Sequence, residues 1–235
     1  MKERSRALTC ICVFLAVAAV FGLPLSAGDL PTFVNLGFSA NSGRFLFGQY
    51  GLDMATGKPY AELYLVDTAR NDFVPKGVLR RNFDTVPEAG QDTAGALYNL
   101  YDEAFPLIKA QKIDHLKVGR LLFLLDGMEA SPSLNFRDFK TGTVYDVTIA
   151  KSISGKGSSY VSSFGLTIQT TDSSSTVRRV SAGNPEIRRQ GVSDYTIRRI
   201  IMAPDEHTLV IIIEKSCVDK TGSSIRYMVE TVKLP

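Results

Sequence analysis

Three pairs of adjacent arginines recur at ten-residue intervals in the last third of the chain. A guanidinium group binds carboxylate, phosphate or sulfate through paired hydrogen bonds, so a surface that collects several guanidiniums suits an anionic ligand. The stretch also holds two acidic residues, Glu186 and Asp194, and its net charge is +4. We predict that the anion-binding surface is formed by Arg178, Arg179, Arg188, Arg189, Arg198 and Arg199.

Two interpretations of these arginines are open. In a strand, adjacent side chains point to opposite faces, so one member of each pair could share a binding surface. The candidate partners are then an anionic envelope glycan, a lipid or an envelope protein, and Tyr160 and Tyr195 offer rings that could stack on a sugar. Alternatively, the arginines lie on edge strands, where charge discourages pairing with another chain.

Candidate residues for catalysis are few. The chain has two histidines, His115 and His207, and it has no Gly-x-Ser-x-Gly motif that would present a nucleophile. Histidines and cysteines are too few for a zinc cage, and the acids at positions 53, 67 and 72 have the spacing of turn residues rather than of a calcium loop. No glycine-rich phosphate loop precedes a Lys-Ser or Lys-Thr pair. We therefore assign no catalytic residue, no metal site and no cofactor.

Paired carboxylates are the remaining route to an enzyme. Asp102 and Glu103 are adjacent on an expected helix and diverge there, whereas Asp126 and Glu129 flank an expected turn. A glycosidase needs two carboxyl groups a short distance apart with separated pKa values, and spacing in the sequence establishes neither condition. The leading hypothesis is therefore a non-enzymatic binding or scaffolding module, and the alternative is a secreted hydrolase that acts on envelope polymers.

The first 27 residues have the pattern of a signal peptide. Basic residues at positions 2, 4 and 6 precede an apolar stretch at 7–23, and Pro24 and a small-residue cleavage site at 25–27 follow it. We predict cleavage after residue 27 and a secreted or periplasmic protein, in which only the uncleaved signal segment contacts a membrane. The apolar stretch is at the lower limit for a membrane span, so an uncleaved anchor is the alternative.

Removal of this segment changes the charge and the cysteine content. The chain carries a net +3, of which residues 1–27 contribute +2, so the mature protein is close to neutral and is not expected to bind nucleic acid. Cys10 and Cys12 lie in the segment, and only Cys217 remains. A single cysteine forms no internal disulfide, and its position after an apolar strand predicts a buried thiol.

Two stretches, at 36–74 and 200–234, share one pattern. A polar turn leads into an apolar strand, and a Thr-Gly pair then leads into a return strand. The pattern is similar to the inner hairpin of a β-propeller blade, although Ala40 stands where that motif has proline and Glu206 stands where it has glycine. An ordinary β-hairpin is the other interpretation.

The remaining patterns predict a mainly β, antiparallel scaffold with one inserted helix. Helical spacing of apolar residues after Thr93 predicts that helix, which should lie across a sheet or close one end, and which Pro106 should kink or split. Hairpins similar to propeller blades or a two-sheet sandwich fit the rest, as a single domain over residues 28–235. Further strands are predicted at 120–126, 143–150, 164–168, 177–180 and 195–202, and loops at 75–90, 151–159 and 181–193.

The chain after residue 27 resembles a family of predicted secreted bacterial proteins of unknown function. The resemblance is carried by the turn at 37–44, the strand entry Pro-Tyr-Ala-Glu at 59–62 and the strand Ile-Arg-Tyr-Met-Val at 225–229. It implies an envelope location, and it implies no activity.

Overall fold

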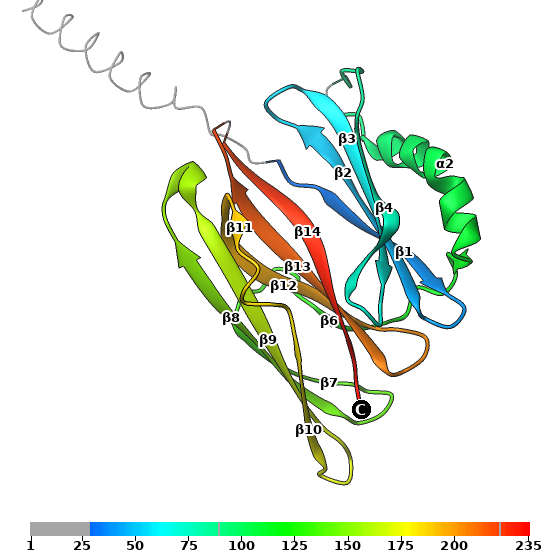
Figure 1. Ribbon diagram of the computed structural model, residues 1–235, viewed down its shortest axis with the longest axis vertical. Helices are drawn as coiled ribbons and strands as arrows, with labels where there is room; N and C mark the ends of the chain where they lie inside the picture. The colour runs from blue at the N-terminus through cyan, green and yellow to red at the C-terminus, as the bar shows by residue number, and fades with distance from the viewer. Residues whose placement is uncertain (1–28, 89, 221) are drawn as a thin grey trace, which may run out of the picture.

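The computed structural model describes residues 29–88, 90–220 and 222–235 (Figure 1). The signal peptide predicted at residues 1–27 lies outside the described residues. Within them, 14 strands form three antiparallel sheets, and the single α-helix lies outside the sheets. The predicted fold class, mainly antiparallel β with one helix, is therefore confirmed. The described residues form three sheets, one more than the two-sheet sandwich that was considered from the sequence.

The first sheet is built from the N-terminal third of the chain in the order β4-β3-β2-β1-β5. The prediction of a loop at 75–90 is wrong for residues 75–82, because these residues continue β4. Pro75 is tolerated because β4 is an edge strand, where no neighbour needs its missing N–H. The strands are β1 (Thr32–Ser39), β2 (Arg44–Asp53), β3 (Lys58–Asp67), β4 (Asp72–Asn82) and β5 (Ile113–Asp114).

The central sheet joins the C-terminal strands to one earlier strand in the order β14-β13-β12-β6. Its strand β13 carries an unbroken apolar run from Leu209 to Ile213, each residue of which is fully buried. Such a run is expected where both faces of a strand are covered. The strands are β6 (Arg120–Leu124), β12 (Val192–Met202), β13 (Thr208–Val218) and β14 (Ser223–Lys233).

The third sheet has the order β10-β9-β8-β7, with the short β11 paired to β9. The predicted alternation is confirmed, since Tyr145, Val147 and Ile149 are all buried. The loop predicted at 151–159 is wrong at its start, because β8 continues to Ser154 opposite β9. The elements are β7 (Ser133–Arg137), β8 (Val144–Ser154), η1 (Gly157–Ser159), β9 (Val161–Thr171), β10 (Val177–Ala182) and β11 (Arg189–Gln190).

The helix α2 (Ala94–Ala110) lies across the outer face of the first sheet, as predicted. Its apolar stripe, including Leu97 and Leu100, packs on Leu63 and Leu65 of β3. Of the two effects predicted at Pro106, a kink or a split, the split is wrong, because the helix continues through Pro106 to Ala110. Pro106 and Asp102 are both exposed, so the carbonyl group of Asp102, which lacks its helical donor, can be hydrated by water.

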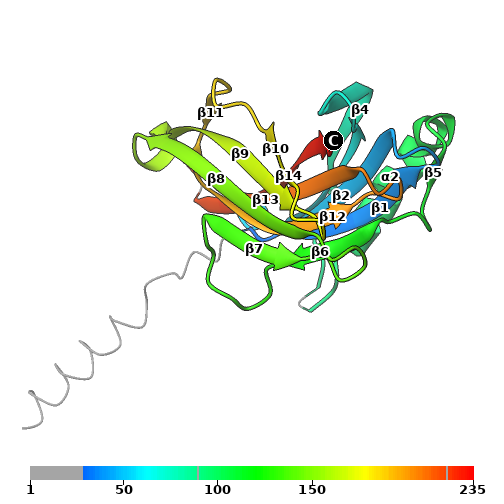
Figure 2. The same ribbon diagram turned by 90° about the horizontal axis from the view of Figure 1, so that it is seen from below.

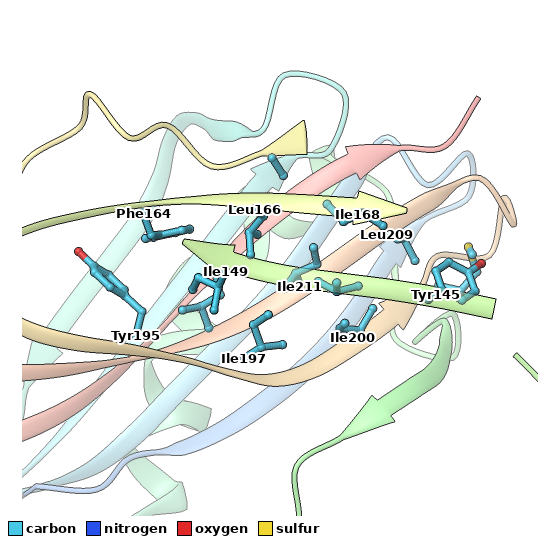
Figure 3. Packing of buried hydrophobic residues seen from close by; sticks show 14 of the residues in the cluster. Tyr145, Ile149, Phe164, Leu166, Ile168, Tyr195, Ile197, Ile200, Leu209 and Ile211 are labelled. Atoms are coloured by element: carbon cyan, nitrogen blue, oxygen red, sulfur yellow. The ribbon is translucent and has the colours of Figure 1, made fainter. Parts of the chain in front are cut away.

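Hydrophobic cores on both faces of the central sheet join the three sheets into layers (Figure 2). Ile211 and its neighbours at alternate positions face the third sheet, where they meet Ile168 and Leu166 (Figure 3). Val210 and Ile212 face the first sheet, where they meet Phe45 and Phe47. The layers are therefore helix, first sheet, central sheet and third sheet.

The two stretches that share a sequence pattern form hairpins that pack on each other. β2 pairs with β3, and β13 pairs with β14, and the core between the first and central sheets separates the two hairpins. Their leading turns have the same backbone form, with φ of 56° at Ser42 and 57° at Glu206. The turns also touch, because the backbone N–H of Asp205 donates to Ser42 Oγ at 3.1 Å.

Candidate functional site

The third sheet separates the first arginine pair from the second. Along β9, Arg178 pairs opposite Thr170 and Arg189 opposite Ser162, and eight residues of strand span about 26 Å. Arg178 and Arg179 are exposed near the β9–β10 turn, where Arg179 Nη2 donates to Gln169 at 2.8 Å. These two arginines therefore form a surface that is separate from Arg189.

A β-bulge orients the third pair. The register of β12 against β13 shifts between Ile197 and Arg199, so Arg198 is an extra residue in β12. Arg198 Nε lies 3.2 Å from Glu214 Oε2, and the guanidinium of Arg199 lies 5.4 Å from the centre of the Phe33 ring. Phe33 belongs to the core between the first and central sheets, so Arg199 faces away from the third sheet.

Arg189 lies on the opposite face, against the core of the third sheet. Its guanidinium carbon lies 5.0 Å from the centre of the Phe164 ring and 5.9 Å from that of Tyr195. These rings are 4.6 Å apart and buried (Figure 3). One guanidinium nitrogen, Nη2, lies 4.0 Å from Glu230 Oε1. Arg188 precedes it as an exposed residue, so only Arg189 of the six is fixed by two rings and a buried carboxyl group.

Arg189 lines a cleft of about 390 Å³ beside β14, which we call the β14 cleft. Three segments that are distant in sequence form its walls: the β3–β4 turn with the start of β4, strand β14, and the loop from β10 to β11. Two arginines and two acidic residues line it together with apolar side chains. Its lining residues include Val66, Arg70, Asn71, Asp72, Phe73, Ile187, Arg189, Met228, Val229 and Glu230.

Glu230 is the most buried charged side chain of the β14 cleft, with 5% of the residue exposed. Burial raises the pKa of its carboxyl group, although hydrogen bonds from Asn71 and from the Gly183 backbone and the charge of Arg189 act to lower it. Asn71 Nδ2 donates to Glu230 Oε2, and Asn71 Oδ1 accepts the N–H of Thr231 at 2.6 Å. Asn71 thus fixes the β3–β4 turn to β14, with φ of 51° in the left-handed region that asparagine tolerates.

The histidines have structural partners or lie in a turn. His115 Nδ1 lies 2.5 Å from the carbonyl oxygen of Leu36, which can only accept, so Nδ1 donates. Tyr101 Oη, 2.6 Å from Nε2, then donates to the imidazole. His207 is exposed in the turn before β13.

The acidic residues considered for catalysis or calcium binding have local roles or are exposed. Glu103 pairs with Arg81, while Asp126 and Glu129 are exposed. Asp53 and Asp67 each accept backbone N–H groups of the turn that follows them. In residues 29–235, apart from 89 and 221, no three His, Cys, Asp or Glu side chains are grouped so as to hold a metal ion.

Cys217 is half-buried beside the core of the third sheet, and burial raises the pKa of its thiol. A raised pKa lowers the fraction of thiolate and with it the reactivity of the group. The raised pKa agrees with the predicted unreactive thiol, although Cys217 is half-buried and not fully buried as predicted.

Sequence reasoning missed Arg70, Asn71 and Glu230 as members of one site. One signal was present, because Glu230 interrupts the apolar positions of a C-terminal strand, and a carboxyl group there must have buried partners. Its partners come from the β3–β4 turn and from β11, which only the packing of three sheets brings together.

The fold and the cleft define a layered, antiparallel β protein with a mixed-charge site between its sheets. In the part of the chain that the structure describes, no helix combines the length and the apolarity that a membrane crossing requires. The model of the family described as "Predicted secreted protein (DUF2259)" matches residues 46–233, and the chain therefore belongs to this family of predicted secreted proteins. The resemblance to secreted proteins of unknown function is thereby confirmed. No curated protein matches the chain.

Proposed function

We propose that this secreted protein is a non-enzymatic binding module that holds an anionic group in the β14 cleft. The proposal rests on the surroundings of the Arg189 guanidinium group. Two aromatic rings fix its guanidinium at the wall of the cleft, and its nearest carboxylate oxygen is 4.0 Å away. At that distance the ion pair lacks the short, charge-assisted hydrogen bonds of a fully formed arginine–carboxylate pair.

Arg70 adds a second guanidinium to the same cleft from the β3–β4 turn. Its side chain is exposed, so a ligand can recruit it without breaking a buried contact. The raised pKa of Glu230 also favours the proposal, because burial penalises the charged form of the carboxyl group that lies nearest to Arg189. Envelope glycans, lipid head groups and peptides all supply the phosphate or carboxylate groups that this pair of arginines would take.

The test compares Arg189→Gln with Arg179→Gln, which removes an exposed arginine about 23 Å away along the third sheet. Inorganic phosphate, acetate and short peptides with a free carboxylate are titrated into each protein by calorimetry. We expect binding by the wild type and by Arg179→Gln, and at least a tenfold loss for Arg189→Gln. Equal affinity in all three proteins, or no binding of any anion, would overturn the proposal.

The second candidate is a hydrolase that uses the two carboxyl groups of the cleft. Glu230, whose pKa is raised by burial, has the property of a general acid, and Asp72 would be the base. Against this role, the oxygens of Glu230 already face Asn71 and Arg189, and Asp72 Oδ1 accepts the N–H of Phe73 at 2.7 Å. Release of product from an envelope polymer by the wild type, and not by Glu230→Gln, would favour it.

A further inference from the structure

Strand β14 is an edge strand, and substitutes for a neighbouring strand accept hydrogen bonds from three of its outward N–H groups. It pairs with β13 over its whole length without a shift of register, so alternate residues direct their N–H groups away from β13. The N–H groups of Ile225, Tyr227 and Thr231 point outward. They donate respectively to Asp29 O at 2.8 Å, Gln49 Oε1 at 2.8 Å and Asn71 Oδ1 at 2.6 Å.

Val229 is the exception in this series. It stands midway between Tyr227 and Thr231, so its N–H has the same outward direction, and it lines the β14 cleft. No other described residue accepts a hydrogen bond from that N–H. A half-buried strand with one open backbone position can pair with an incoming extended chain, as in recognition by strand addition.

The two side-chain amides on either side of Val229, which stand in for a neighbouring strand, limit what can enter the β14 cleft. Gln49, which is fully buried, and Asn71 occupy the places that a neighbouring strand would fill beside Tyr227 and Thr231. A long strand that passed through the cleft would displace both amides. The end of a chain needs only the open position at Val229.

The rest of the cleft is chemically complementary to the C-terminus of a peptide. Arg189 and Arg70 offer guanidiniums to a terminal carboxylate. Phe73 and Ile187, which are 46% and 49% exposed, offer apolar contact to a last side chain. Val66 and Met228 extend the apolar wall.

We propose that the β14 cleft binds the C-terminal end of an extended peptide whose last side chain is apolar. The carboxylate lies at Arg189 and Arg70, a main-chain carbonyl of the peptide accepts the N–H of Val229, and the last side chain lies on Phe73 and Ile187. This inference rests on the proposed function, because it names the ligand class of the same site.

The experiment uses an acetylated tripeptide ending in leucine, either as the free acid or as the C-terminal amide, and free leucine as a third probe. Affinity is measured by calorimetry, and the Val229 amide is followed by NMR. We expect the free acid to bind at least tenfold more tightly than the amide, with a shift of the Val229 resonance. Arg189→Gln should remove the difference between acid and amide, whereas Arg179→Gln should keep it.

A second pair of variants tests the apolar contact. Phe73→Ala and Ile187→Ala should each weaken the leucine peptide severalfold and leave a glycine-ended peptide unchanged. Val177→Ala, at a residue of β10 that is 57% exposed, is the matched control. Equal loss for both peptides would contradict a contact with the last side chain.

The outcomes separate this inference from the proposed function. If acetate and phosphate bind through Arg189 but the peptide acid binds no better than acetate, the anion site stands and the peptide inference is wrong. Tighter binding of free leucine than of the tripeptide, or an unshifted Val229 amide, would also overturn the inference. If no anion and no peptide binds, both proposals are wrong.

Discussion

The carboxyl group of Glu230 makes stability depend on pH at the scale of one residue. Burial holds its pKa in the folded protein above the ordinary value of 4.5. Between the two values the folded state binds more protons than the unfolded chain, so the free energy of unfolding falls as pH rises through this window. The stability that this group contributes is therefore fully present below the ordinary pKa, and it is lost as pH rises through the raised pKa of the folded protein.

We predict that Glu230→Gln makes the free energy of unfolding less dependent on pH above 4.5, because glutamine does not ionise and can still accept from Asn71. Urea unfolding followed by circular dichroism at acidic and neutral pH measures the effect. Glu129→Gln, at an exposed position, is the control. An unchanged pH dependence in Glu230→Gln would show that Glu230 is not the source.

At the residue scale, the arginine pairs were visible in the sequence, but their surroundings were not. The period-two rule assigned the two members of each pair to opposite faces. The bulge at Arg198 breaks that rule in β12, and nothing in the local sequence marks it. Anion binding by all six arginines stays a prediction, and the separation of the pairs is the reason to test Arg189 on its own.

The helix α2 shows how one element is stabilised. The inner face of the helix packs on β3 through residues such as Leu100, which is 2% exposed, while Tyr98 on the same helix is 71% exposed. Leu100→Ala should lower the free energy of unfolding by about 2–5 kcal/mol, through lost burial and a residual cavity. Tyr98→Ala should change it by about 0.5 kcal/mol or less.

Urea unfolding monitored by circular dichroism gives both values. Comparable losses for the two variants would mean that the helix is not held by its inner face. At this scale the sequence predicted elements in which burial imposes a long period, as in α2 and in β8. It missed β4 because that strand is largely exposed, and it missed β7 because an alternation over five residues is short.

The central sheet links the layers of the whole molecule. Ile211 and Ile212 are adjacent and fully buried, yet they face different cores. Each substitution to alanine should lower the free energy of unfolding by about 2–5 kcal/mol. Each variant should still unfold in a single transition, because both cores depend on β13. Val177→Ala is the exposed control.

Circular dichroism and tyrosine fluorescence, which the absence of tryptophan makes the intrinsic probe, should report coincident urea transitions in each variant. Two separated transitions would mean that the first sheet with α2 unfolds independently of the third sheet. The fully apolar run in β13 is typical of a strand that is covered on both faces, but it does not indicate which strands cover it.

The sequence by itself determined the family, the antiparallel β class, the helix α2 and the two matching hairpins, whereas the signal peptide at residues 1–27 stays a prediction. Each of these depends on local composition or on a period of side chains along one segment. The tertiary structure decided the third sheet, the separation of the arginine pairs and the β14 cleft. These depend on contacts between residues as far apart as Asn71 and Glu230, and such contacts form only when sheets pack, because no local pattern encodes which edge strands come together.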